Sequence, residues 1–440
     1  MKNLLFLLIF LANTAIAYSN QDPIPGPRDC FWARGPFSAD PYINVAYPDS
    51  NVFYWAAAFS MPEDSSLEIK GDYPRSRYMS FFSYDERGRP IGSLTDRLIK
   101  SESVNPFIPG NQRSDFYRTF TLKVLNERPS VSKNADEAPN DFVNNILYAP
   151  QYRDNQQLIV YRVYLPDKNT APTGGVDLPQ PILTLSDGTQ LIGKEACRIL
   201  KARQPLQVSF DALGIPPNEY RKLISQPDKP DTWPAHNPTK WFIQLDRKSL
   251  IGMYTGNIDP NAPRSEGGFY PNLDNHYIRA IINRKHGKVL VIRGKAPTTP
   301  QTYHGASIVE ESDLRYWSLC SNQSFVNTRV NDCLFDEEIP INKNGFYTIA
   351  ISRAEDRPRN AVKECGIAWL PMADDGDGMF DEDVTIIQFR HMLPSKDFKH
   401  SIQRVMKQDQ LESIMGPYMP KARYFMTNQV ETFFPCVTNK

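Results

Sequence analysis

The chain has 440 residues, which exceeds the 250 to 300 residues or so at which a single hydrophobic core stops growing, so two lobes are expected. It carries 50 basic and 50 acidic residues, and this balance argues against nucleic acid as a partner because neutralising phosphates needs a concentrated basic face. Its 37 prolines are spread along the sequence, which suits short strands joined by turns better than long helices.

The first residues have the layout of a secretory signal peptide. Lys2 precedes an uncharged run from Leu4 to Ala12, and small residues follow at Ala15 and Ala17. A membrane anchor is the alternative, but this run is shorter than the twenty or so residues with which a helix crosses a bilayer. We therefore expect residues 1–17 to be removed and the mature protein to be secreted or periplasmic. No later segment has the length and hydrophobicity of a transmembrane helix.

An internal repeat organises the rest of the chain. Five segments of the first half have counterparts in the same order in the second half: 67–74 with 289–297, 77–80 with 315–318, 119–129 with 348–358, 146–150 with 367–371 and 161–166 with 389–394. The offset between matching residues varies only from 221 (Pro150 to Pro371) to 238 (Arg77 to Arg315). This order favours a duplication over the alternative of two unrelated β domains.

Within the copies, apolar residues recur with the period of two that a strand with one buried face requires, as at Phe120, Leu122 and Val124. Three segments are apolar on both faces and indicate central strands: 52–59, 158–165 and 277–282. We predict a mainly β protein of two tandem antiparallel β-sandwich or jelly-roll-like modules, at residues 18–166 and 241–394.

Helical patterns lie between the copies and after them. Two sets of apolar residues have the spacing of one helix face: Ile192, Ala196, Ile199 and Leu200, and then Phe398, Ile402, Val405 and Met406. They predict a helix-bearing connector at residues 167–240 and a C-terminal helical cap at residues 395–440.

Six cysteines in an exported chain favour disulfide bonds. Many pairings are open, and we predict only Cys320 with Cys333, which closes a loop of modest length. Cys197 lies in a helical pattern, so a free buried thiol is the alternative there.

Several of these segments resemble those of an uncharacterised family of exported bacterial two-repeat β proteins. The segments are Tyr73 to Asp85 (YPRSRYMSFFSYD), Val104 to Phe107 (VNPF), Arg315 to Cys320 (RYWSLC), Ala368 to Pro371 (AWLP) and Phe389 to Pro394 (FRHMLP). More distantly, the Y-W-S, W-L-P and R-x-x-L-P order resembles the second of the paired domains of unknown function called twelve-fifty-four and twelve-fourteen. The resemblance covers residues 42–425 and implies a β-rich fold, with no established activity to carry over.

Residues 374–383 concentrate acidic side chains on a glycine-containing loop. Calcium takes several oxygen ligands on such loops, and Asp375, Asp377, Asp381 and Asp383 could supply them. The EF-hand spacing is not met, because Met379 stands at the third ligand position. A solvated acidic hairpin loop is the alternative, and the sequence indicates no other cofactor.

Four arginines occupy matching places in the two copies: Arg77 with Arg315, and Arg162 with Arg390. Buried guanidinium groups can clamp a carboxylate or phosphate ligand. The alternative is that they anchor strands by pairing with Asp96 or Asp332 of their own module, since duplication preserves structural pairs as well.

Three further residues are candidates for binding or catalysis. Tyr148 and Trp369 stand in matching turns, with core packing as their alternative. His391 follows Arg390 in an expected strand and is the histidine to test first, its alternative being a half-exposed strand residue. The sequence has no G-x-S-x-G or H-E-x-x-H motif, which leaves open whether the protein is an enzyme.

These observations favour an exported two-lobe binding or envelope-associated protein, with a small-molecule or surface ligand in a groove between the lobes. An extracellular or periplasmic metal-independent hydrolase and a structural surface protein are the alternatives.

Overall fold

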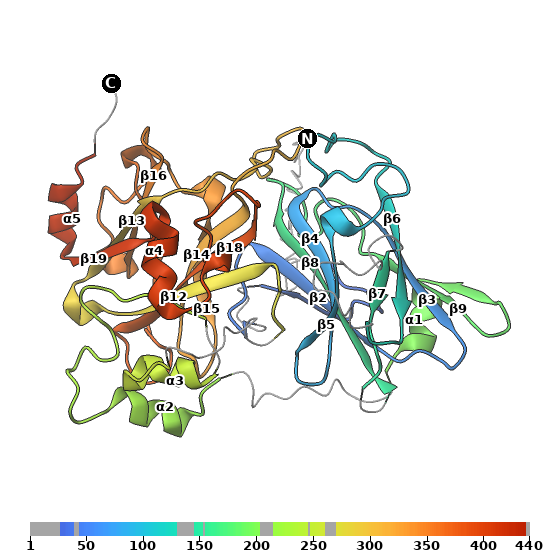
Figure 1. Cartoon of the computed structure of the whole chain (residues 1–440), viewed down its shortest axis with the longest axis horizontal. Helices are drawn as coiled ribbons and strands as arrows, with labels where there is room; N and C mark the ends of the chain where they lie inside the picture. The colour runs from blue at the N-terminus through green and yellow to red at the C-terminus, as the bar shows by residue number, and fades with distance from the viewer. Residues whose placement is uncertain are drawn as a thin grey trace, which may run out of the picture.

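The computed structural model describes residues 27–38, 44–129, 145–152, 155–202, 214–244, 247–259 and 270–436, and the structural statements below concern these residues. The predicted signal peptide lies outside them. The chain forms two β modules that lie side by side, the first in blue and green and the second in yellow to red (Figure 1). This arrangement confirms the predicted mainly β, two-module architecture.

The first module consists of two five-stranded sheets with the orders β1-β2-β8-β4-β5 and β10-β9-β3-β6-β7. The strands of the first sheet are β1 (Arg34–Phe37), β2 (Val52–Phe59), β8 (Gln157–Pro166), β4 (Ser76–Tyr84) and β5 (Pro90–Thr95). Those of the second are β10 (Gln190–Ile192), β9 (Gln180–Thr184), β3 (Ser66–Asp72), β6 (Thr119–Leu125) and β7 (Ile146–Tyr148). Their apolar faces share one core, in which Phe81 stacks on Tyr161 at 4.8 Å between ring centres and Phe120 packs against them.

The second module repeats this arrangement with the sheet orders β11-β12-β18-β14-β15 and β17-β16-β13-β19. The first of these sheets contains β11 (Phe242–Ile243), β12 (Asn275–Asn283), β18 (Val384–Pro394), β14 (Leu314–Asn322) and β15 (Val330–Phe335). The other contains β17 (Ala368–Pro371), β16 (Phe346–Ser352), β13 (Val289–Lys295) and β19 (Lys421–Phe425). The strand pairs β6–β7 and β16–β17 are parallel, and the other pairs are antiparallel. Each module therefore has one parallel pair, at the same edge of its second sheet.

The strand patterns read from the sequence agree with these sheets. Phe120, Leu122 and Val124 are buried on one face of β6 while their neighbours are partly or fully exposed. The predicted central strands are β8, in the middle of its sheet, and β2 and β12, each next to the middle strand. Both faces of these strands are covered, which explains their continuous hydrophobicity.

The predicted connector and cap contain strands that belong to the modules. β9 and β10 fall within residues 167–240 yet pair with β3 and with each other, and β19 falls within residues 395–440 yet pairs with β13. In both modules, a short strand from outside the repeated segments covers an edge of the second sheet that would otherwise be unpaired.

The two predicted helix faces are only partly formed. α1 (Lys194–Leu200) buries Ala196 and Leu200, whereas Ile192 lies in β10 and, like Ile199, is exposed. After β18, Ile402–Arg404 is a single 3-10 turn, and Met406 beyond it is exposed. The tail is instead a series of short turns that ends in α4 (Leu411–Met415), β19 and α5 (Thr427–Phe433).

Two helices of the connector region pack on the first sheet of the second module. α2 (Pro217–Ile224) and α3 (Arg247–Thr255) lie side by side at the edge of that module (Figure 1). Tyr220 of α2 and Met253 of α3 pack with Ile281 of β12 and Ile386 of β18. The connector thus gives the second module an additional apolar cluster between these helices and the sheet.

All six cysteines form disulfide bonds: Cys30 with Cys197, Cys320 with Cys333, and Cys365 with Cys436. The predicted Cys320–Cys333 pair is confirmed and joins directly opposite residues of β14 and β15. The free thiol considered for Cys197 is wrong, because this residue ties α1 to the segment before β1. Among the helices of the described ranges, none is both long and apolar enough to cross a bilayer.

Candidate functional site

Each module extends a short arm onto the other. The first arm, residues 44–51, precedes β2, and both its Asn44 and its Tyr47 hydrogen-bond to main-chain groups in or next to β15. The second arm, residues 270–275, leads into β12, and the hydroxyl of Tyr84 donates to the carbonyl of its Pro271. These exchanged arms make the contact between the modules reciprocal.

The arginines of the first matched pair form ion pairs across this contact. Nη1 of Arg77 lies 2.9 Å from Asp336, and Nη1 of Arg315 lies 3.4 Å from Asp96. Arg77 also pairs with Glu337. The expectation of pairing within one module is therefore wrong, because each aspartate sits in a 3-10 turn that faces the neighbouring module.

Arg390 and Arg162 also lie at the contact but differ in their partners. Arg390 pairs with Asp49 of the first arm, which also accepts a hydrogen bond of 2.7 Å from Ser318. Arg162 hydrogen-bonds instead to the hydroxyl of Tyr84 and lies over the rings of three aromatic residues. Asn272 stands in the second arm where the first has Asp49, so no carboxylate reaches Arg162 among the described residues.

Apolar side chains fill the space between these arginines. Tyr164 packs against Tyr316 across the contact at 5.8 Å between ring centres, in one cluster with Tyr78 and Met392. Arg162 also donates to the carbonyl of Tyr270 in the second arm, so each of the four matched arginines contacts the other module, and all four are buried.

The acidic loop has partners within the protein for most of its carboxylates. Asp377 is buried, accepts hydrogen bonds from three main-chain N–H groups of its own loop and binds the hydroxyl of Tyr220 at 2.8 Å. Asp375 accepts a hydrogen bond from Gln323, and Asp383 forms an ion pair with Arg284. Asp381 accepts the main-chain N–H of Asp383. Calcium binding remains a prediction.

One group of potential metal ligands is found in the described parts of the chain: Asp49, Cys320 and Cys333 lie within 4.8 Å of one another. The two cysteines form a disulfide bond, so this cluster offers a single carboxylate.

His391 is fully buried in β18, and the alternative of a half-exposed strand residue is wrong. Burial lowers the pKa of His391 to about 3, so the imidazole is neutral at physiological pH. Its Nδ1 accepts the main-chain N–H of Ile402 at 3.2 Å. The ring therefore holds the chain after β18 against the sheet.

Tyr148 and Trp369 lie in β7 and β17, at matching edges of the second sheets. The indole N–H of Trp369 donates to Ser352, and the guanidinium of Arg357 lies 4.4 Å from its ring centre. The carbonyl of Tyr148 accepts a hydrogen bond from Ser83. Neither residue lines the pocket described next, and their ligand role stays a prediction.

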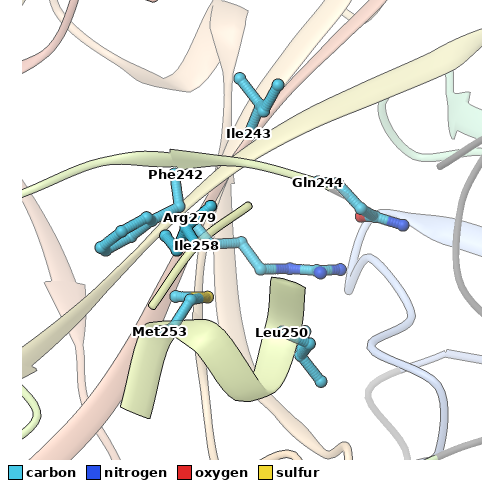
Figure 2. A pocket seen from close by; sticks show the side chains of 7 residues that line it. All are labelled: Phe242, Ile243, Gln244, Leu250, Met253, Ile258 and Arg279. Atoms are coloured by element: carbon cyan, nitrogen blue, oxygen red, sulfur yellow. The ribbon is translucent and has the colours of Figure 1, made fainter. Parts of the chain in front are cut away.

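A pocket lies between α3 and strands β11 and β12 of the second module. It contains about 280 Å³ of space, part of it open solvent, and is lined by Phe242, Ile243, Gln244, Leu250, Met253, Ile258 and Arg279. Figure 2 shows the Arg279 side chain extending between Gln244 on one side and α3 on the other, whereas the side chain of Ile243 points away. We call this the Arg279 pocket.

The charge of Arg279 is buried without an acidic partner among the described residues. Its Nε donates to Oε1 of Gln388 at 2.6 Å, and the guanidinium carbon lies 5.6 to 5.8 Å from the ring centres of Tyr47, Tyr277 and Phe325. Burial lowers the pKa of Arg279 below its ordinary value, and the positive charge of Arg390 acts in the same direction. An anion in the pocket would compensate for this loss of hydration.

The first module has no counterpart of this charge. Arg279 faces Gln388 on β12 and β18, and at the corresponding place on β2 and β8 Ala56 faces Val160. The internal repeat does not single out Arg279, because Ala56 stands at its place in the other copy. A comparison of the copies for charges present in only one would have found it.

No protein-family model and no curated protein matches the sequence. Among solved structures, the chain is similar to an uncharacterised protein from Burkholderia cenocepacia, with 10% identity and a TM-score of 0.44 over 90% of this chain and 84% of that one. It is also similar to a protein from Vibrio parahaemolyticus, with 10% identity and a TM-score of 0.37 over 86% of this chain and 90% of that one. Likeness at this level transfers no function to the chain.

Proposed function

We propose that the chain is an exported binding protein whose ligand occupies the Arg279 pocket. The observation that carries the proposal is a buried arginine in a pocket of the second module, without a carboxylate partner among the described residues. Of the four matched arginines, Arg77, Arg315 and Arg390 have carboxylate partners, whereas Arg162 donates to the hydroxyl of Tyr84 and to the carbonyl of Tyr270 at the contact between the modules. A buried cation left unpaired costs stability, and a ligand that supplies the opposite charge gives a reason to retain it.

Export is part of the proposal. The signal-like residues 1–17 and the three disulfide bonds support an oxidising destination, either the periplasm or the medium. The resemblance to exported two-repeat β proteins points the same way. Mass spectrometry of the mature protein after expression with its own leader tests this directly, with Tyr18 expected as the first residue. Intact Met1 on protein from a cell envelope or medium would contradict it.

A thermal-shift screen tests binding. Any ligand that binds only the folded state raises the melting temperature with its concentration. Sugars, fatty acids, small organic acids, amines and inorganic anions form the panel, and Arg279→Met is screened beside the wild type. The proposal expects at least one class to stabilise the wild type and to lose this effect in the variant. If no compound stabilises the wild type, the proposed function is wrong.

A further inference from the structure

We infer that the Arg279 pocket takes a small monocarboxylate with an apolar body and a hydrogen-bond donor close to its carboxylate. This inference rests on the proposed binding function and specifies the ligand class. Three features of the pocket carry it: a single cation with its outer edge unoccupied, an apolar wall, and a buried acceptor without a partner.

The cation selects the charge of the ligand. Nε of Arg279 donates to Gln388, and this is the one hydrogen bond that the guanidinium makes with the described residues. The edge that carries the two Nη atoms therefore has no acceptor among these residues. That edge presents two parallel donors, the geometry that binds a carboxylate in a bidentate manner. The rings of Tyr47, Tyr277 and Phe325 surround the guanidinium and restrict its orientation. One positive charge matches a monocarboxylate better than a doubly charged phosphate ester.

The walls select the body of the ligand. Phe242 and Met253 are buried, and Leu250 and Ile258 are partly buried with them in the cluster between α3 and the sheet. The space of about 280 Å³ includes open solvent, so the enclosed part of the pocket is smaller than this volume. The apolar part of the ligand is therefore short, on the scale of a branched aliphatic group.

Gln244 calls for a hydrogen-bond donor on the ligand, next to its carboxylate. Its Oε1 is buried and accepts no hydrogen bond from the described residues. Figure 2 places this side chain near the guanidinium end of Arg279. Leaving a buried acceptor unpaired is unfavourable, so a hydroxyl or amide N–H next to the ligand carboxylate would bind here. A 2-hydroxy acid has this arrangement of groups.

Four probes of similar size test the inference by calorimetric titration: 3-methylbutanoate, 2-hydroxy-3-methylbutanoate, 3-methylbutanamide and 3-methylbutylamine. We expect both acids to bind the wild type, the hydroxy acid about tenfold more tightly, and the amide and the amine at least tenfold more weakly than the acids. Arg279→Met should lose at least tenfold in affinity for both acids. Gln244→Leu should bind the two acids equally, and Arg359→Met, on the exposed surface, serves as the matched control.

The outcomes separate this inference from the proposed function. Binding of the amide or the amine as tight as that of the acids, or unchanged acid binding by Arg279→Met, overturns the carboxylate assignment while the binding function stands. A hydroxy acid preference that survives Gln244→Leu overturns the role of Gln244. If none of the four probes binds, the inference is overturned. The proposed function fails as well only if no compound of the wider thermal-shift panel stabilises the protein. Circular dichroism confirms that each variant is folded, and Arg279→Lys, which keeps the charge, replaces any Arg279→Met protein that is not.

Discussion

Arg77 and Arg315 hold corresponding positions in the two modules, and each donates a hydrogen bond to the main-chain carbonyl of the other, at 3.0 and 3.1 Å. The aspartates that pair with them are equally reciprocal. Asp96 accepts the N–H of Met79 in its own module, and Asp336 accepts the N–H of Trp317 in the same way. Such mutual contacts are those of an isologous interface between two copies of one subunit. Here the two copies are parts of a single chain.

Arg77→Met is expected to destabilise the protein by about 3–5 kcal/mol, because it leaves the carboxylates of Asp336 and Glu337 buried without a counter-charge. Urea unfolding followed by tryptophan fluorescence measures the loss. Arg359→Met is the control, since Arg359 pairs with Glu431 on the exposed surface and its removal should hardly shift the midpoint.

The double variant Arg77→Met/Asp336→Leu tests whether the pair acts as a unit. It removes one unpaired carboxylate together with the arginine, so it should be more stable than the sum of the two single losses predicts. Additive losses would show that Arg77 and Asp336 stabilise the protein independently of each other.

The sequence predicted the β modules well because their strands are repeated and alternate regularly, as in β6. It did not place β9 and β19 in the modules, since these five-residue strands lie outside the repeated segments and pair with strands far away in the chain. Short segments carry too little periodicity to distinguish a strand from a turn or helix.

The matched arginines show a second limit. Their burial was expected, but the partner of Arg77 lies 259 residues away in the other module. Duplication suggests that a pair stays within its copy, whereas an isologous contact exchanges the partners between copies. The matched arginines thus lie at the contact between the modules, and the candidate binding residue Arg279 has Ala56 as its counterpart.

The disulfide bonds should differ in their contribution to stability. Cys30–Cys197 spans 167 residues and Cys320–Cys333 only 13, so loop-closure entropy assigns them roughly 5 and 3 kcal/mol. We expect the Cys30→Ser/Cys197→Ser variant to unfold at lower urea than Cys320→Ser/Cys333→Ser. An inverted order of the two midpoints would mean that native-state contacts outweigh chain entropy.

Asp377 should stabilise the acidic loop without calcium. Asp377→Ala leaves the hydroxyl of Tyr220 and three main-chain N–H groups without their acceptor, and a loss of about 3 kcal/mol is expected. Asp377→Asn keeps an acceptor oxygen and should lose much less. Both measurements are made with chelator and with millimolar calcium. A stability that rises with calcium in the wild type but not in Asp377→Asn would instead favour the metal site.

Asp274 of the second arm should make stability depend on pH. Burial raises the pKa of its carboxyl group to about 6, helped by the nearby Asp96 carboxylate and opposed by the hydroxyl of Tyr78, which donates to it at 2.6 Å. The folded state thus holds this proton more tightly than the unfolded state, in which the pKa is 3.8. Stability is therefore lost as the pH rises from about 4 to about 6, and the full loss of about 3 kcal/mol persists above that.

Asp274→Asn removes this loss. The amide oxygen of the new asparagine can still accept the hydrogen bond from Tyr78. An asparagine, Asn51, already stands at the matching position of the first arm. Its carbonyl accepts the N–H of Leu165, just as the carbonyl of Asp274 accepts the N–H of Leu393. The variant should be more stable than the wild type by about 3 kcal/mol at pH 7.5, and the difference should shrink toward zero at pH 3.5. Urea midpoints across this range measure the difference. If it were the same at every pH, a change in packing would be the cause, because only a titrating carboxyl group makes the gain disappear in acid.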